Sequence, residues 1–372
     1  MSVNTVSENI NRHILSSYPA EYQPAEVSLL DTVPSLSICR HWRVSSPDIT
    51  FLLRRIPFNC ITKEHLQFQQ AVLWQAVCEG ITFVPLPLET KRHKGFVSYG
   101  GGYWELLPWF PPQEELDSQC SSADGLLSVN NSPNSNILFR IVSAMMSLAQ
   151  FHIAVSTFPV PNCSVSISEK CGEQLSLWKY YLGGHLHKLH NILSNALSNP
   201  QYCSRLPNYA ALADCGFRAI EQALLYTGQA MSMLKKGAEV PVPIQVIIGN
   251  VCGRHLRFDE DGLCGIIDFK ELCIDSVSWD IASLLGSTAG CNSMLWSAGI
   301  KAYQSIRPLT RNEMFLIKTF ELSPFLLKAL DYLAKVFLED QLFTDRQIAE
   351  LTRRIENWCR RFEIERKHRC IA

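Results

Sequence analysis

The residues best suited to chemistry lie between positions 248 and 280. Asn250 follows a glycine in the segment Ile248–His255, and a short run with an Asp-Gly turn separates that segment from the carboxylate Asp268. A second carboxylate, Asp280, comes 12 residues after Asp268, where an apolar segment begins. The pattern predicts a strand, a tight turn, a short hairpin and a carboxylate at the exit of that hairpin. A carboxylate placed there serves either as a metal ligand or as the cap of a nearby turn.

This segment resembles the catalytic core of the aminoglycoside phosphotransferase and choline kinase-like superfamily. The family pattern is H-G-D-x-H-x-x-N, a short hairpin, [VI]-I-D-F and a helix that carries D-[LI]-A, and the spacing here matches it. Phe51–Arg55 resembles the third strand of the family, and Leu148–His152 resembles its L-A-x-x-H helix. The resemblance covers residues 36–290 approximately, and it implies ATP and Mg²⁺ as cofactors of an active member.

The resemblance also implies a role for each position. In the family the Asp of H-G-D orients the acceptor hydroxyl and accepts its proton, while Mg²⁺ bridges the phosphate oxygens. Asp268 occupies the metal-binding position of I-D-F, and Asp280 occupies the position that supports the catalytic loop. Three other positions are changed: Asn250 stands for the catalytic Asp, His255 for the metal-binding Asn and Arg54 for the strand Lys.

Each replacement weakens the chemistry of the family. The amide of Asn250 hydrogen-bonds a hydroxyl but has no useful basicity, and loss of a general base lowers a rate by about 10²–10⁴. The imidazole of His255 suits Zn²⁺ better than Mg²⁺, which prefers oxygen ligands. Arg54 keeps the charge of the Lys but not its reach or shape. A simpler interpretation of Asn250 is a turn residue that satisfies the loop backbone.

The nucleotide-binding segment is altered too. Two turns could serve as the phosphate-binding loop, Thr32–Ser37 and Ser45–Asp48, and neither contains glycine. Gly100–Gly102 lies farther along, between two predicted strands, which favours a hairpin turn over a phosphate cradle. The resemblance places the hinge that faces adenine just after these glycines, so Glu105 and Leu107 are predicted to bind the nucleotide.

Two functions of different classes follow. In the first, the chain is a catalytically impaired pseudoenzyme that acts as a scaffold or ligand sensor, and it needs no cofactor. In the second, it is an active phosphotransferase that uses ATP and Mg²⁺ at Asp268 to phosphorylate a hydroxyl of a small molecule, with Asn250 positioning the acceptor. The replaced positions favour the first, and whether the chain is an enzyme stays open. The sequence identifies neither the acceptor nor a protein partner.

The elements that must position these residues predict an α+β, two-lobed protein kinase-like fold. Residues 1–112 form a β-rich N-lobe, 113–136 a Ser- and Asn-rich linker, and 137–372 a helical C-lobe. In the N-lobe the hydrophobic patterns predict a hairpin over 36–53, a helix over 63–79, and strands over 95–99 and 103–107.

In the C-lobe the apolar patterns predict helices near 137–154, 173–198, 207–236 and 279–288. An extended segment is predicted over 243–248, and a hairpin over 256–267. The sequence Thr344–Gln347 predicts a capping box at the start of a last helix. The predicted buried face of that helix comprises Ile348, Leu351, Ile355, Trp358 and Phe362.

Composition limits the remaining possibilities. The 372 residues are 47% hydrophobic and 19% charged, which predicts folded cores and excludes a mostly disordered chain. With 34 Lys and Arg against 35 Asp and Glu, the charge of -1 argues against nucleic-acid or membrane partners. No secretory leader or membrane span is expected. The 14 cysteines include no C-x-x-C pair, which predicts thiols of a reducing compartment and a cytoplasmic location.

Overall fold

The computed structural model describes residues 13–22, 26–30, 39–46, 48–111, 135–159, 165–198, 207–290, 292–321, 323–339, 341 and 343–371. The chain divides into two units, which we call the β unit and the helical unit. The β unit comprises Met1–Glu114, Ile153–Phe158 and His255–Leu272. The helical unit comprises Glu115–His152, Pro159–Arg254 and Cys273–Ala372. Segment 255–272, which the sequence analysis assigned to the C-lobe, thus groups with the β unit. Most of the predicted linker 113–136 lies outside the described residues.

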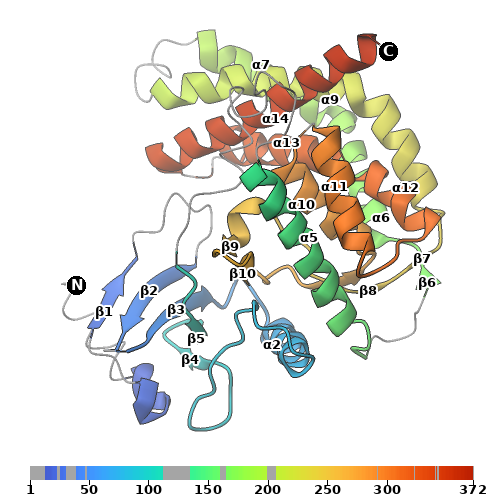
Figure 1. Cartoon of the computed structure of the whole chain (residues 1–372). Coiled ribbons are helices and arrows are strands. Elements are labelled where there is room, and N and C mark those ends of the chain that lie inside the picture. Colours follow the sequence, from blue (N-terminus) through green and yellow to red (C-terminus); the bar gives the residue numbers. More distant parts are fainter. Residues whose placement is uncertain are drawn as a thin grey trace. The chain divides into compact units, whose positions relative to one another are not determined.

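An antiparallel sheet with the strand order β1-β2-β3-β5-β4 forms the frame of the β unit (Figure 1). Its strands are β1 (Glu26–Leu29), β2 (Arg40–Ser45), β3 (Thr50–Pro57), β4 (Val97–Tyr99) and β5 (Gly102–Pro108). The predicted hairpin and the later strand pair are confirmed. Strand β1 was not predicted, because its four residues are too few for their alternation to be distinguished from chance.

Turn chemistry fixes how the other elements of the β unit begin and end. Helix α2 (Lys63–Cys78) begins after Thr62, whose hydroxyl accepts a hydrogen bond from the backbone N–H of His65 at 3.1 Å. It ends near Gly80, whose φ of 88° only glycine adopts readily. Gly100 and Gly101, with φ of 57° and 77°, turn β4 into β5, so the hairpin interpretation of this glycine run is confirmed.

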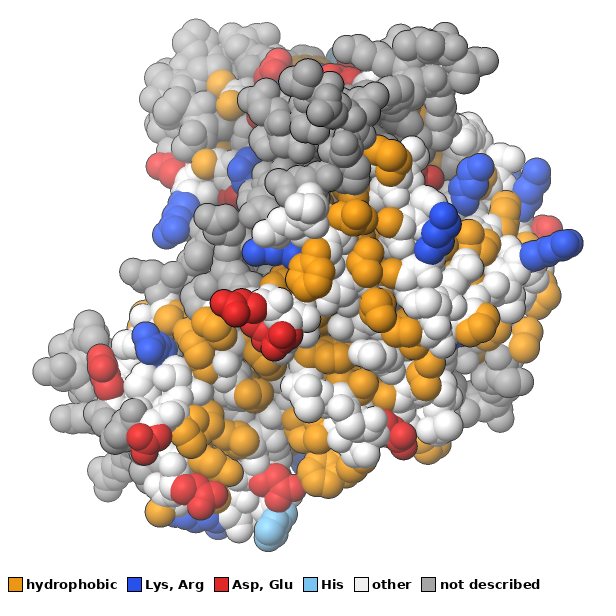
Figure 2. Space-filling model, in the orientation of Figure 1, with side chains coloured by type: hydrophobic (Ala, Val, Ile, Leu, Met, Phe, Trp, Pro, Cys, Tyr) orange, Lys and Arg blue, Asp and Glu red, His pale blue; other side chains and the backbone are white. Residues whose placement is uncertain are grey.

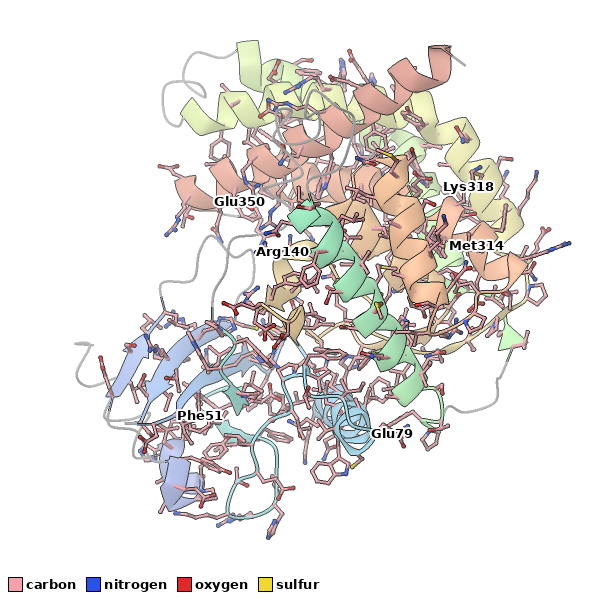
Figure 3. The ribbon with its side chains drawn as sticks, viewed as in Figure 1. Phe51, Glu79, Arg140, Met314, Lys318 and Glu350 are labelled. Carbon is pink, nitrogen blue, oxygen red and sulfur yellow. The ribbon has the colours of Figure 1, made fainter. Side chains whose placement is uncertain are left out.

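The buried side of the sheet packs around aromatic residues. Trp42 and Trp104 stack with ring centroids 5.0 Å apart, and Leu53 and Leu106 are fully buried beside them. Tyr18 closes this core from the short helical turns η1 (Leu15–Ser17) and η2 (Ala20–Tyr22). Figure 3 labels Phe51, a further member of this core. The core holds β2, β3 and β5 in the register that later positions Arg54 and Glu105.

The β unit also contains the predicted second hairpin. Strand β9 (Leu256–Phe258) pairs antiparallel with β10 (Leu263–Ile266), and the Asp259 carboxylate accepts from the N–H groups of Asp261 and Gly262 in the turn. A Cβ at Gly265 would lie 2.5 Å from the ring of Phe110, so only glycine lets this ring approach the strand. The hairpin leads directly to Asp268.

Nine helices, counted over the described residues, make up most of the helical unit (Figure 1). They are α5 (Ser135–Ala154), α6 (Glu169–Tyr180), α7 (Leu186–Ser198), α9 (Pro207–Gly237), α10 (Ser278–Thr288), α11 (Ser293–Gln304), α12 (Arg311–Thr319), α13 (Ser323–Phe337) and α14 (Asp345–Ile371). Short segments complete it: β6 (Val165–Ser166) with β7 (Val242–Pro243), β8 (Gln245–Ile247) with β11 (Cys273–Asp275), η3 (Tyr181–His185) and η4 (Gly253–His255).

Most predicted helices are confirmed. The exception is 173–198, which is two helices joined by η3, because Gly183 and Gly184 leave helical geometry there. The capping box is present: the N–H of Thr344 donates to Gln347 Oε1 at 2.9 Å, and the N–H of Gln347 donates to Thr344 Oγ1 at 3.3 Å. The predicted face of α14 is buried, with Trp358 only half-buried. Helices α11 and α12 lie in the region that was predicted as helical without individual bounds, and strand β11 was not predicted.

One described helix, α5, is long and apolar enough to cross a membrane by length and composition. The sequence analysis expected no such segment. In the structure 56% of its most apolar window is buried. A Cβ at Gly299 of α11 would lie 3.3 Å from both Ile141 and Met145, so α5 packs tightly against a neighbouring helix. These contacts are those of a core helix. On the face shown in Figure 2, hydrophobic side chains (orange) outnumber charged ones (blue and red) and alternate with white atoms of the backbone and other side chains.

Candidate functional site

The predicted site residues divide between the two units. Arg54, Glu105, Leu107, His255 and Asp268 lie in the β unit, and Asn250 and Asp280 lie in the helical unit. The unit boundary falls inside the predicted catalytic loop, between Arg254 and His255. We therefore describe the two parts of the site separately.

In the β unit, Arg54 on β3 is paired with Glu105 on β5. The two residues are direct partners across the strands, and Arg54 Nη2 and Nε donate to Glu105 Oε2 at 2.7 and 3.1 Å. Gln70 of α2 donates to the other carboxylate oxygen at 2.9 Å. The side chains of Arg54 and Glu105 are only 13% and 1% exposed. This guanidinium is therefore committed to a carboxylate of its own sheet rather than left free for a phosphate.

The hinge prediction names the next part of the same strand. The side chain of Glu105 is held by Arg54 and Gln70, and the side chain of Leu107 is fully buried. Neither side chain is free to face a nucleotide, so a contact with adenine here would have to use the backbone. The nucleotide-binding role of both residues stays a prediction.

Asp268 lies among nitrogen groups just after the β9–β10 hairpin. Its Oδ1 accepts from the backbone N–H of Lys270 at 3.3 Å. Its Oδ2 lies 3.8 Å from His255 Nε2 and 3.9 Å from Lys270 Nζ. Helix α2 fixes this turn, because Gln69 donates to the Lys270 carbonyl at 2.7 Å. The structure thus brings Asp268 and His255 together, as the sequence analysis predicted, and adds Lys270, which it had missed.

The charges around Asp268 act on one another. Burial favours the neutral acid, but the charges of His255, Lys270 and Arg54 outweigh burial and hold the pKa of Asp268 below its usual value. At His41, the cross-strand partner of Arg54, burial and positive charge act in the same direction. Burial and then the charge of Arg54 lower the pKa of His41 to about 4, and its Nδ1 is buried with no hydrogen-bond partner in the described structure. Asp268 is thus a single carboxylate among the basic side chains of Lys270, Arg54 and His255.

These residues do not fit Mg²⁺. The ion needs near-octahedral oxygen coordination. Here the predicted donor set offers one carboxylate and one imidazole, and an ammonium group lies 3.9 Å from that carboxylate. Over the described residues, no group of three or more His, Cys, Asp or Glu side chains is placed to hold a metal ion.

In the helical unit, Asp280 holds the predicted catalytic loop. Its carboxylate, fully buried at the start of α10, accepts from the N–H of Ile248 at 2.7 Å and from the N–H of Gly249 at 2.9 Å. His152 of α5 contacts the same carboxylate at 3.1 Å and bonds the Tyr303 hydroxyl with its other nitrogen at 2.8 Å. This is the loop-supporting arrangement that the resemblance implied for Asp280. It also explains the motif Leu148–His152 of the sequence analysis, because its His152 contacts the Asp280 carboxylate.

Asn250 is the last part of the site. Its Oδ1 accepts a hydrogen bond of 3.2 Å from Lys328 Nζ of α13. The sequence analysis missed Lys328, although a signal was present: it is the one charged residue in the apolar run Pro324–Leu330. The chemistry at this loop position is therefore an amide beside an ammonium group, in place of the carboxylate of the family motif.

Comparison with known proteins agrees with this architecture. No family model matches the chain. A homoserine kinase from Zymomonas mobilis is 30% identical over 105 residues, which span 27% of this chain and 33% of that enzyme. Thus the matched segment spans only a third of the length of the curated relative.

Solved structures match over nearly the full length. An aminoglycoside phosphotransferase from Alicyclobacillus acidocaldarius superposes with a TM-score of 0.54 and 15% identity, covering 96% of both chains. The chain has the kinase-like fold of the aminoglycoside phosphotransferases. An amicoumacin kinase bound to AMP-PNP and Ca²⁺ shares this kinase-like fold with a TM-score of 0.57 and 12% identity, over 96% of this chain and 94% of that one. A microcompartment-associated aminopropanol kinase superposes with a TM-score of 0.54 and 13% identity, over 96% and 95%. The predicted fold class is thereby confirmed.

Proposed function

We propose that this chain is a kinase-fold protein with impaired phosphoryl transfer, which binds a small molecule as a sensor or scaffold. The observation that carries the proposal is the surrounding of Asp268, where His255 and Lys270 lie at 3.8 and 3.9 Å from the carboxylate. Phosphoryl transfer consists mostly of positioning and charge neutralisation by metal ions. A site whose carboxylate already faces an imidazole and an ammonium group does not favour Mg²⁺. Asn250 adds to this, because an amide is no general base.

A second candidate is an active small-molecule phosphotransferase. One observation favours it: Asp280 and His152 hold the loop at Ile248 and Gly249 as an intact scaffold. In that case Asn250 would position the acceptor hydroxyl. The matched relative is a homoserine kinase, which makes homoserine the first acceptor to test.

For either function we propose a cytoplasmic location. The described cysteines are all free thiols, among them the buried Cys171, Cys215 and Cys359. Burial is the largest cause that raises the pKa of Cys171 and Cys359 to about 12, so both stay protonated and inert at neutral pH.

Thermal-shift titration with ATP and GTP, each with and without Mg²⁺, tests the proposal. We expect no Mg²⁺-dependent shift and no ATP turnover with homoserine for the natural chain. The double variant Asn250→Asp/His255→Asn restores the carboxylate and the oxygen ligand. We expect it to gain a Mg²⁺-dependent shift of several degrees at saturating nucleotide, since a ligand at 100 times its Kd stabilises by about 2.7 kcal/mol.

Adding Asp268→Asn to the double variant is the matched control. It should abolish the Mg²⁺ response that the double variant regains, because it removes the Asp268 carboxylate on which that response depends. Mg²⁺-dependent ATP turnover by the natural chain would refute impaired catalysis and establish the second candidate.

A further inference from the structure

Lys328 is a partly buried lysine in an otherwise apolar stretch of α13. Its neighbours Leu327 and Ala329 are only 2% and 1% exposed. These buried neighbours fix the helix backbone, so the ammonium group is held at Asn250, 3.2 Å from its Oδ1. The loop on the other side of this contact is equally fixed, because the Trp279 indole donates to the Gly249 carbonyl at 2.6 Å. A cation and an amide are thus held together by two rigid elements.

The charge of Lys328 has no acidic partner in the described structure. No described carboxylate oxygen lies within 4.0 Å of its Nζ. Asp331, one turn farther along α13, is 2.7 Å from Lys335 and engaged there. Asp280, the buried carboxylate of the same loop, already accepts from two backbone N–H groups and contacts His152.

A partly buried ammonium group beside a neutral amide favours an anion. A carboxylate at position 250 would satisfy this charge within the protein. The amide of Asn250 is neutral, so it accepts a hydrogen bond from Lys328 without balancing the charge.

We propose that Asn250 and Lys328 form a binding site for the carboxylate of a small hydroxy acid. The inference deepens the proposed function, since it names the class of molecule that a sensor or an enzyme with this loop would take. Lys328 forms the ion pair with the ligand carboxylate, and the site selects against cationic compounds by repulsion. Lys328 is a binding residue here, and no covalent step is involved.

Three compounds with one carbon skeleton provide the test. Glycerate carries a carboxylate at one end, glycerol a neutral hydroxyl, and 3-amino-1,2-propanediol an ammonium group. Calorimetric titration of the full chain is performed without nucleotide and without Mg²⁺. We expect binding in the order glycerate, glycerol, aminopropanediol, with glycerate tighter than glycerol by about tenfold to a hundredfold, the range of a charge-assisted hydrogen bond.

Four variants locate the effect. Lys328→Met removes the charge and Asn250→Asp neutralises it, so both should reduce glycerate binding to the level of glycerol. Lys328→Arg keeps the charge and should retain most of the preference. Lys318→Met is the matched control, because Lys318 is an exposed lysine of the same unit on α12 (Figure 3). It should bind glycerate like the natural chain. A circular dichroism spectrum of Lys328→Met that matches the natural chain shows that its loss of binding is not misfolding.

Three results would overturn the proposal: equal affinity for glycerate and glycerol, unchanged glycerate binding in Lys328→Met, or no glycerate binding at millimolar concentration. A separate ATP titration covers the other source of anionic oxygens. If Lys328→Met weakens ATP binding and leaves glycerate binding intact, the site serves a phosphate and the proposal fails. Because the glycerate titration contains no nucleotide, its outcome is independent of catalysis. ATP turnover would refute impaired transfer and leave the hydroxy-acid site standing.

Discussion

At the scale of single residues, the charged groups of the candidate site are mostly neutralised within the protein. Arg54 is bound to Glu105, and Asp280 is bound to loop N–H groups and His152. Asp268 faces basic groups. Lys328 differs from these, since its hydrogen-bond partner is a neutral amide. Ligand selectivity should therefore depend more on Lys328 than on the residues that the family motif emphasises.

His41 predicts how acid affects the β unit. Its pKa is about 4 in the fold, lowered first by burial and then by Arg54, against about 6.5 in an unfolded chain. Between these values the unfolded chain binds a proton that the folded chain does not, so the free energy of unfolding falls as the pH drops from about 6.5 to 4. Below about pH 4 this contribution stops changing. We expect His41→Gln to reduce the difference in unfolding free energy between pH 7 and pH 5, measured by denaturant titration.

The matched control for this prediction is His93→Gln. The His93 side chain is 87% exposed, in a loop of the same unit. This variant should keep the pH dependence of the natural chain. If His41→Gln also keeps it, the imidazole of His41 is protonated in the fold and the interpretation is wrong.

At the scale of elements, prediction from the sequence succeeded where local patterns decide the structure. Alternation gave β3, turn glycines gave the β4–β5 hairpin, and Thr344 with Gln347 gave the start of α14. It failed for β1 and β11, which are short and owe their existence to pairing with distant strands. Helices α11 and α12 were predicted only as part of a helical C-lobe, without bounds of their own. The start of α12 carries a signal that was overlooked, because Thr310 and Glu313 have the spacing of a capping box.

Gly265 gives a prediction for the β9–β10 hairpin. A methyl group there would lie 2.5 Å from the Phe110 ring, so Gly265→Ala must displace the ring or the strand. We expect the unfolding free energy to fall by about 1–3 kcal/mol, as for other overpacked sites. Gly265→Ala/Phe110→Leu should recover part of this loss, measured by denaturant titration.

Gly172 in α6 is the control glycine. No atom lies within 4 Å of the position that its Cβ would take. Gly172→Ala should therefore be neutral or raise stability by up to about 1 kcal/mol through helix propensity. An equal loss in both variants would mean that general backbone effects, and not the contact with Phe110, explain the result.

At the scale of the whole molecule, the fold class was predicted correctly, but the chemical surroundings of the predicted site residues were not. Asn250, His255, Asp268 and Asp280 were singled out by their match to the motif of the resembling family. Lys270 and Lys328 were not, because their contacts depend on α2 fixing a turn and on α13 meeting the loop. No spacing rule links positions 250 and 328. Partners contributed by distant helices require the folded chain.

The division into two units predicts where a single substitution is felt. Asp280→Asn weakens or removes acceptors of buried N–H groups in the helical unit, and we expect the unfolding free energy to fall by about 1–3 kcal/mol. Hydrogen exchange should increase at 248–249 and along α10. Segments 48–111 and 255–272 of the β unit should keep their protection.

Asp331→Asn is the control, since the Asp331–Lys335 pair lies at the surface with side chains 44% and 37% exposed. Such pairs contribute less than about 1 kcal/mol. If Asp280→Asn raises exchange equally in both units, they open as a single cooperative body.

The composition of the β unit has a consequence during synthesis. Its last segment ends at Leu272, and about half of the helical unit precedes that residue in the chain. A ribosome adds about 5–20 residues per second, so the sheet with β5 is available well before its hairpin partner has been translated. Until then the ring of Phe110 lacks the glycine strand that it packs against. The nascent segment up to Glu114 therefore remains incompletely packed until segment 255–272, encoded about 160 codons later, has been translated.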